Sequence, residues 1–146
     1  MSLLEFSLRL GLACFCGMAI GFERQWRHKS AGLRTNTLVA TGSAAFVLVS
    51  FLLVAENVDV TRIIGQVVTG IGFLGAGVII RQGAQITGLT TAATIWCSAA
   101  VGSLAAAGFY FESLICTGLI ILVNITLVYA DAWLKKRRPE TGPDKQ

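Results

Sequence analysis

Five stretches of this chain carry almost no charged side chains, and short polar segments separate them. The stretches cover residues 10–22, 38–55, 63–80, 89–111 and 114–130. A helix needs roughly 17–25 mainly apolar residues to cross the hydrocarbon core of a bilayer, and four of the stretches are near that length. Charged residues make up 14% of the chain, whereas about a quarter is usual in soluble domains. The pattern predicts an all-α membrane protein with about five transmembrane helices.

The first stretch, residues 10–22, is the shortest of the five. Glu5 and Arg9 would lie inside its helix, which requires the long Arg9 side chain to reach the membrane interface. A signal peptide with Arg9 as its basic region is the alternative, but an Ala-x-Ala cleavage pattern is absent from the sequence. Gly17 and Gly21 are spaced for helix packing. We therefore expect a retained helix.

Lysine and arginine are distributed unevenly among the polar segments. If the N-terminus lies outside, ten basic residues fall on the cytoplasmic side and only Arg9 and Arg62 fall outside. The cytoplasmic ten are Arg24, Arg27, Lys29, Arg34, Arg81, Lys135, Lys136, Arg137, Arg138 and Lys145. Because basic residues are retained in the cytoplasm, this asymmetry predicts an outer N-terminus and a cytoplasmic C-terminus. The net charge of +4 then follows from topology and implies no nucleic acid partner.

The last predicted helix ends close to Trp133, a residue type that suits the membrane interface. Residues 1–134 are therefore assigned to one transmembrane domain. Residues 135–146 form a basic polar tail that we expect to be disordered. Its four consecutive basic residues at 135–138 could attract anionic lipid.

Small residues follow two faces of the predicted helix at 63–80. They are Gly65, Thr69, Gly72 and Ala76 on one face and Gly70 and Gly77 on another. Gly70, Gly72 and Gly75 also match the spacing of a dinucleotide-binding loop, but the βαβ unit that such a loop requires is missing. Close approach of backbones through small residues is a main source of packing energy between helices in lipid. We expect this helix at the centre of the bundle, in contact with the first helix at Gly17 and Gly21, and such faces could also form a homodimer.

Two segments about 56 positions apart resemble each other. Arg24-Gln25 precedes Gly32-Leu33-Arg34-Thr35, and Arg81-Gln82 precedes Gly88-Leu89-Thr90-Thr91. Each segment links a helix that runs inward to a helix that runs outward. This correspondence suggests a parallel repeat of two helical hairpins, an arrangement found in membrane transport folds.

The richest polar segment lies between the first two predicted helices, on the cytoplasmic side. Thr35 or Asn36 could cap the second helix, and Thr90 or Thr91 could cap the fourth. Two helix N-termini with free N–H groups would then face the cytoplasm and favour an anion such as a phosphate, a carboxylate or a lipid headgroup. The alternative is that the arginines are membrane anchors, with Glu23 paired to one of them. The candidate residues for binding an anion or a partner are Glu23, Arg24, Arg34, Thr35, Asn36, Arg81, Thr90 and Thr91.

Transport of a small solute is a second candidate function. Thr117, Asn124 and Asp131 share one face of the last predicted helix and could line a polar path. However, hard cations such as magnesium prefer several oxygen ligands including carboxylates, and none of the eight carboxylates lies mid-membrane in the predicted topology. Asn124 is more typical of a hydrogen bond between helices.

Catalytic and metal-binding patterns are weak throughout the sequence. There is no set of serine, histidine and acid within the predicted spans and no phosphate-binding lysine loop. The four cysteines lie within predicted spans, form no Cys-x-x-Cys pair, and are expected to be reduced and apolar. The sequence therefore predicts no enzyme activity, no cofactor and no metal site.

Four blocks of the sequence closely resemble the bacterial MgtC/SapB family, and they occur in the family's order. The blocks are GFERQ (21–25), AGLRTNTLV (31–39), GIGFLGAGVI (70–79) and GLTTAATIW (88–96). The resemblance implies a bacterial inner-membrane protein with a five-helix domain that supports growth at low magnesium and survival inside macrophages. It also suggests regulation through membrane partners, notably inhibition of the proton-driven ATP synthase.

Older names in this family describe a magnesium transport ATPase, which the residues above argue against. Longer members carry a cytoplasmic C-terminal domain that resembles a small ligand-binding regulatory fold. The present sequence ends at Gln146, so no property of that domain is carried over. The sequence thus favours a non-enzymatic, multi-pass inner-membrane regulatory protein. The alternative is a transporter or channel for magnesium or another small solute, in which the glycine-rich helix would flex to open a path.

Overall fold

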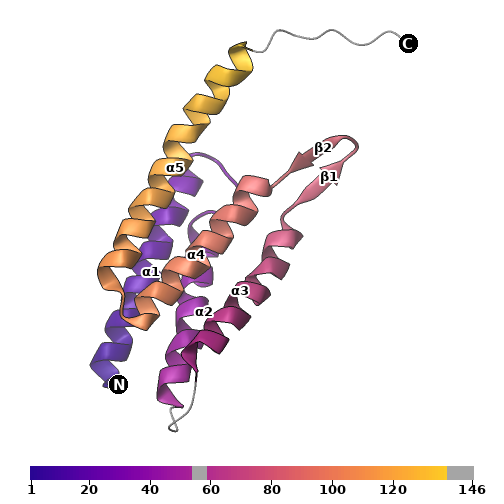
Figure 1. The fold of residues 1–146 in the computed structure, drawn as a ribbon. Coiled ribbons are helices and arrows are strands. Elements are labelled where there is room, and N and C mark those ends of the chain that lie inside the picture. Colours follow the sequence, from indigo (N-terminus) through magenta and orange to yellow (C-terminus); the bar gives the residue numbers. More distant parts are fainter. Residues whose placement is uncertain (54–58, 138–146) are drawn as a thin grey trace.

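The computed structural model describes residues 1–53 and 59–137, with side chains described throughout these ranges except at residues 131, 132 and 135–137 (Figure 1). It contains five long helices. They are α1 (Leu3–Trp26), α2 (Leu33–Leu52), α3 (Val60–Gly77), α4 (Leu89–Ala107) and α5 (Tyr110–Arg137). All five are long and apolar enough to cross a membrane. The prediction of an all-α membrane protein with about five spans is confirmed.

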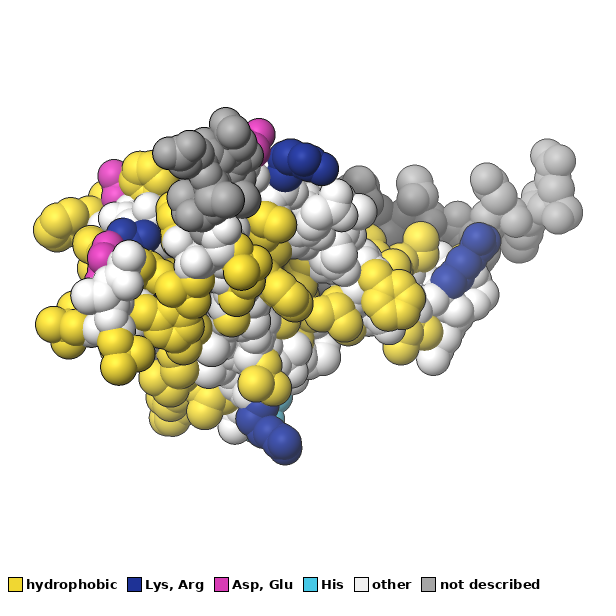
Figure 2. Space-filling view, turned by 90° about the horizontal axis from the view of Figure 1, so that it is seen from below, with side chains coloured by type: hydrophobic (Ala, Val, Ile, Leu, Met, Phe, Trp, Pro, Cys, Tyr) yellow, Lys and Arg dark blue, Asp and Glu magenta, His cyan; other side chains and the backbone are white. Residues whose placement is uncertain are grey.

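The surface of the helices is apolar over most of its area. Large hydrophobic side chains such as Leu3, Phe73 and Phe111 are each more than three-quarters exposed. Figure 2, which views the end where α1 begins, shows hydrophobic side chains around the sides of the molecule. A soluble monomer rarely exposes apolar patches of this extent. This surface is suited to contact with lipid.

The ends of the helices divide the connecting segments into two groups (Figure 1). The α1–α2 connection, the α3–α4 connection and the end of α5 lie at one end, which we call the basic end because it carries most of the lysines and arginines. The positive-inside rule predicts that this end faces the cytoplasm. The helix α5 continues to Arg137, three residues past the predicted domain boundary at 134. Residues 138–146 of the predicted tail lie outside the described residues.

A short β-hairpin joins α3 to α4, which the sequence analysis did not anticipate. Strand β1 (Ile80–Gln82) pairs antiparallel with β2 (Gln85–Thr87), and Arg81 lies opposite Ile86. The apolar stretch predicted to be helical to residue 80 therefore leaves the helix at Gly77, because the β-branched residues that follow favour an extended strand. Gly83 has a φ of 61° in the two-residue turn, a conformation that hairpin turns require.

Helices that begin at opposite ends of the bundle have different caps. At the outer end, Ser2 accepts a hydrogen bond from the Glu5 N–H (3.1 Å), and Asp59 accepts from the Thr61 hydroxyl (2.6 Å) and N–H (2.9 Å). These bonds from Thr61 hold the pKa of Asp59 below its usual range. At the basic end, α2 and α4 begin after glycines that supply no side-chain cap.

The helix at the centre of the bundle is α4, which packs against the other four helices. Its small residues, such as Ser98, Ala99 and Gly102, are buried on several faces. By contrast, Ile71 and Gly75 are the buried residues of α3, which lies at the edge of the bundle. The prediction that α3 is central is wrong, because the alanines and serines of α4 allow close approach as well as glycine does.

The glycines differ sharply in what surrounds them. A Cβ atom at Gly17 would lie 2.7 Å from the Asn36 carbonyl oxygen, and one at Gly21 would lie 2.6 Å from the Leu33 Cα. These two glycines therefore pack closely, but against α2 and not against α3 as expected. Gly102 of α4 also packs closely against α2, because a Cβ there would overlap the Ala40 carbonyl.

The glycines of α3 make fewer contacts. Gly75 faces the Ala92 methyl group of α4, since its Cβ would lie 3.7 Å from that atom. A Cβ at Gly65, Gly70, Gly72 or Gly77 would meet no described atom within 4 Å, and Ala76 is exposed. The predicted packing role of these residues is not fulfilled within a single chain and stays a prediction.

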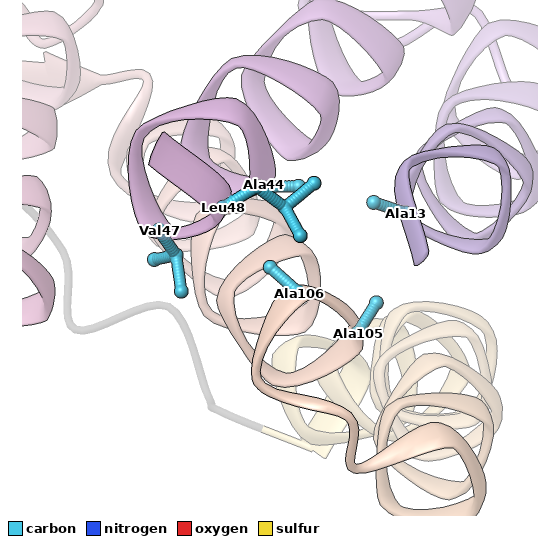
Figure 3. Packing of buried hydrophobic residues seen from close by; sticks show 6 residues of the cluster. All are labelled: Ala13, Ala44, Val47, Leu48, Ala105 and Ala106. Carbon is cyan, nitrogen blue, oxygen red and sulfur yellow. The ribbon is translucent and has the colours of Figure 1, made fainter. Parts of the chain in front are cut away.

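A buried hydrophobic cluster fills the space between three helices in the outer half of the bundle. Side chains from α1, α2 and α4 meet there (Figure 3). The cluster consists of Ala13, Ala44, Val47, Leu48, Ala105 and Ala106, all with no exposed surface. Because most of its members are alanines, the three helix backbones lie close together.

Matched glycine substitutions test this packing. We expect Gly102→Ala to lower the free energy of unfolding by about 1–3 kcal/mol, the usual cost of adding a methyl group to a filled interior. Gly118→Ala, at a glycine of α5 with open space around it, is the control and should leave stability unchanged or raise it by up to about 1 kcal/mol, because alanine favours helix. Unfolding of the purified protein in detergent micelles measures both. Equal effects of the two changes would contradict the observed packing.

Candidate functional site

A cavity of about 820 Å³ lies at the basic end, between the end of α1, the N-terminus of α4 and residues 123–128 of α5. Small-molecule sites usually have volumes of roughly 300–1,000 Å³. Three basic residues and one acidic residue are among the residues that line it. The full set is Glu23, Arg24, Arg27, Lys29, Ser30, Ile86, Gly88, Leu89, Thr90, Thr91, Val123, Asn124, Leu127 and Val128. We call it the basic-end cavity.

The buried cation of this cavity is Arg24, whose side chain is only 3% exposed. Its Nη2 donates to the Thr91 hydroxyl (2.7 Å) and to the Ser30 carbonyl (3.0 Å). Its Nε is buried and has no hydrogen-bond partner in the described part of the chain. A buried charge is costly unless it is paired and its hydrogen bonds are satisfied. Arg24 therefore retains capacity to bind an acceptor.

The neighbouring acid, Glu23, is committed to other partners. The Asn124 side-chain amide of α5 donates to Glu23 Oε2 (3.3 Å), and Arg27 Nη1 lies 3.7 Å from Glu23 Oε1. Arg27 also donates to the Asn124 carbonyl (3.1 Å) and lies over the Tyr129 ring at 5.6 Å. These contacts join α1 to α5. Arg24 itself forms no ion pair with any described carboxylate.

The N-terminus of α4 forms another part of the cavity wall. Gly88 is the N-cap residue and has a φ of 89°, and the Val78 carbonyl lies where its Cβ would be. Thr90 and Thr91 were predicted as caps, but they lie in the first turn, because α4 begins two to three residues earlier than expected. The first N–H groups of a helix have no partner within it, and the positive end of its dipole favours an anion.

The N-terminus of α2 is built differently from the prediction. The N-cap is Gly32, and Asn36 is fully buried inside the first turn. The Asn36 amide donates to the Ala31 and Gly32 carbonyls, and its oxygen accepts from the Ser98 hydroxyl of α4 (2.8 Å). Asn36 therefore ties α2 to α4 and is closed to an external ligand.

Only half of the predicted anion-binding residues meet in one place. Glu23, Arg24, Thr90 and Thr91 line the basic-end cavity. The other four do not line it: Arg34 and Thr35 are exposed on α2, Asn36 is buried, and Arg81 is exposed on β1 with its Nε donating to the Gly83 carbonyl (3.1 Å). Arg81 is carried away from the expected place by the unforeseen hairpin.

Three further residues line the cavity without having been predicted from the sequence as site residues: Arg27, Lys29 and Ser30. The spacing of Glu23 and Arg27 at i and i+4 was the available signal, since such pairs meet on one helix face. Nothing in the sequence pattern places Ser30 beside Thr91, although their hydroxyl oxygens lie 3.0 Å apart.

The polar residues predicted to line a path along α5 make hydrogen bonds within α5 or to α1, as far as their side chains are described. Thr117 is buried and donates to the Ser113 carbonyl (2.7 Å), and Asn124 bonds to Glu23. The side chain of Asp131 lies outside the described residues. A hydrophobic cluster of Cys16, Ile20 and Val101 lies deeper in the bundle, where it joins α1 to α4.

Metal-binding groups are sparse in the structure as far as it is described. No cluster of three or more His, Cys, Asp or Glu side chains that could hold an ion occurs among the described residues. The cysteines Cys14, Cys16, Cys97 and Cys116 are free thiols.

The α1–α2 and α3–α4 connections, whose sequences resemble each other, correspond in structure only where the next helix begins. Gly32 and Gly88 occupy equivalent places, each one residue before the start of a helix that runs outward. Arg24 and Arg81 do not correspond in space, because one lies at the end of α1 and the other lies on β1. The repeat of two hairpins therefore stays a prediction.

Known proteins resemble this chain over most of its length. Residues 10–133 match the MgtC family. Protein MgtC of Brucella abortus is 54% identical over 115 residues, which cover 79% of this chain and 48% of that protein. Protein MgtC of Salmonella typhimurium is 49% identical over 127 residues, covering 87% and 54%. An uncharacterized protein of Synechocystis is 50% identical over 123 residues, covering 84% and 52%.

The chain thus spans about half the length of the curated relatives that it matches. No solved structure matches it.

Neighbouring residues of α2 provide a test of the assignment of Asn36. Asn36→Ala should lower the free energy of unfolding by about 1–3 kcal/mol, because Ser98 and the Ala31 and Gly32 carbonyls lose their buried partner. Thr35→Ala, at an exposed position, should change it by less than about 0.5 kcal/mol. Chemical unfolding in micelles measures both variants. A stable Asn36→Ala protein would show that these bonds contribute little.

Proposed function

Since the chain belongs to the MgtC family, we propose that it is a non-enzymatic regulatory protein of the inner membrane whose basic-end cavity binds an anionic ligand. The observation that carries this proposal is the buried Arg24, which lines the cavity with an unpartnered Nε and no carboxylate partner among the described residues. An anion would balance its charge and complete its hydrogen bonds.

The regulatory part of the proposal rests on family membership. The resemblance links such proteins to growth at low magnesium, to survival inside host cells and to inhibition of the ATP synthase. A regulator of this kind acts through contacts with membrane partners, and the ATP synthase is the partner that we propose. The basic-end cavity faces the cytoplasm in the predicted orientation, where such a partner or an anionic ligand is accessible.

Transport of magnesium or another small solute is the alternative function. A transport route would have to continue from the basic-end cavity through the bundle to its outer end. Two hydrophobic clusters lie on that course, one around Ile20 and Val101 and one around Ala13 and Leu48. Passage of a hydrated ion would require these helices to separate, so the geometry favours the regulatory function.

The two functions predict different behaviour of the purified protein in liposomes. We expect magnesium entry no faster than in protein-free liposomes, because two closely packed hydrophobic clusters lie between the basic-end cavity and the outer end. A magnesium-sensitive dye inside the liposomes measures the flux. Saturable flux that disappears in Arg24→Gln would overturn the regulatory proposal in favour of transport.

Proton-driven ATP synthesis in inverted bacterial membrane vesicles tests the regulatory function directly. Added protein should lower ATP synthesis, and Arg24→Gln should require about 10- to 100-fold more protein for the same effect, because charge-assisted hydrogen bonds contribute roughly 1.5–3 kcal/mol. Arg62→Gln is the matched control, since Arg62 is exposed on α3 far from the cavity. Identical inhibition by the wild-type protein, Arg24→Gln and Arg62→Gln would show that the basic-end cavity has no part in the regulatory function.

We also propose that the two exposed glycine-bearing faces of α3 form a homodimer surface. Gly65, Gly70, Gly72 and Gly77 have open space where a Cβ would be, and small residues allow a second helix to approach closely in lipid. Gly72→Leu should shift the protein toward the monomer in crosslinking and in mass measurement from lipid nanodiscs. Gly118→Leu, at an equally open glycine of α5, should not. A protein that is monomeric before any substitution would refute this surface.

A further inference from the structure

We infer that the ligand of the basic-end cavity is the headgroup phosphate of an anionic phospholipid from the cytoplasmic leaflet. This inference rests on the proposed anion site and names the ligand that the cavity accepts. Its evidence is the combination of a basic wall and an apolar wall in one cavity at the depth of the membrane interface.

The two walls of the cavity differ in chemistry. Arg24, Lys29 and Thr91 supply cationic and polar groups on one side, whereas Leu127 and Val128 of α5 supply an apolar surface on the other. A free inorganic anion gains nothing from an apolar wall. A ligand with a charged end joined to hydrocarbon contacts both walls, which is the chemistry of a phospholipid.

The apolar wall is continuous with the outer surface of the bundle. Leu127 is 57% exposed and Val128 is 40% exposed, although both also line the cavity. They belong to the segment of α5 that is apolar enough to cross the membrane, Tyr110–Ala130. Their exposed atoms therefore face acyl chains, so a lipid could place its headgroup in the cavity while its chains stay in the bilayer.

The charged wall lies at the height of the membrane surface. Arg24 is two residues before the end of α1 at Trp26, which is 75% exposed. Exposed tryptophans are typical of the headgroup level, and two residues correspond to about 3 Å along a helix. The guanidinium of Arg24 is thus at the depth that a headgroup phosphate occupies.

The available charges suit a phosphodiester. Because Arg27 pairs with Glu23, Arg24 and Lys29 remain as cations of the cavity without a carboxylate partner among the described residues. Arginine binds phosphate oxygens through neighbouring N–H groups. The α4 N-terminus adds backbone N–H groups, as in other phosphate sites. One diester phosphate would accept a hydrogen bond from the unpartnered Nε of Arg24 and lie near Lys29.

The experiment compares three probes on the purified protein in detergent: phosphatidylglycerol, phosphatidylcholine and inorganic phosphate. Native mass spectrometry counts bound lipid, and a thermal shift titration gives the affinity of each probe. We expect phosphatidylglycerol to bind at least about tenfold more tightly than phosphatidylcholine, a difference of about 1.4 kcal/mol. Inorganic phosphate should bind more weakly than phosphatidylglycerol because it makes no use of the apolar wall.

Substitutions on each wall locate the binding. Lys29→Gln should weaken binding of phosphatidylglycerol and of phosphate, and it is used beside Arg24→Gln because Arg24 also holds Ser30 and Thr91 in place. Leu127→Ser should weaken only the lipid. Leu119→Ser is its control, since Leu119 is similarly exposed on α5 (54%) and does not line the cavity.

The outcomes separate failure of the lipid assignment from failure of the site. Phosphate binding as tight as that of phosphatidylglycerol, with no effect of Leu127→Ser, would show that a soluble anion is the ligand while the anion site stands. Lipid binding that is unchanged in both Arg24→Gln and Lys29→Gln would place the lipid elsewhere and overturn the inference. If no anionic probe binds the wild-type protein, the proposed anion site itself is wrong.

Discussion

The rest of this structure depends on the close contact of α2 and α4, where Gly102 lies against the Ala40 carbonyl. In lipid, helices gain little from burying apolar side chains, so association depends on how closely their backbones approach. Small residues along α4 permit that approach on several sides at once. The other four helices are arranged around it, and α3 is held by few contacts at the edge.

The position of the basic-end cavity follows from this arrangement. Since α4 is central, its N-terminus lies between the ends of α1 and α5 at the basic end. The long α1–α5 pair is joined there by Glu23, Arg27 and Asn124, which leaves Arg24 to face α4. The polar contacts that join α1 to α5 thus leave Arg24 and Lys29 without an ion pair among the described residues.

Two arginines near opposite ends of α1 illustrate the difference between a structural role and the proposed binding role. Near the outer end, Arg9 pairs with Glu5, donates to the Ala106 carbonyl (2.7 Å) and lies over the rings of Phe51 and Tyr110. Its Nε also has no described partner, but its charge is balanced. Arg24 donates to two neutral oxygens, those of Ser30 and Thr91, and forms no ion pair with a described carboxylate. In the proposed function, a bound anion supplies the counter-charge at the basic end, whereas Glu5 supplies it at the outer end.

Much of this protein was determined by the sequence itself. The number of helices and their exposure to lipid depend on runs of apolar residues, which are read directly along the chain. Arg24 and Thr91 were also recognised as candidates, because each lies at the cytoplasmic end of a predicted span. Only the tertiary structure decided that α4 and not α3 is central, that Asn36 is internal while Thr35 is exposed, and that Arg81 leaves the site on a hairpin. Partition into lipid depends on the sum of many side chains, whereas packing depends on which faces fit each other across helices, and a linear pattern does not contain that information.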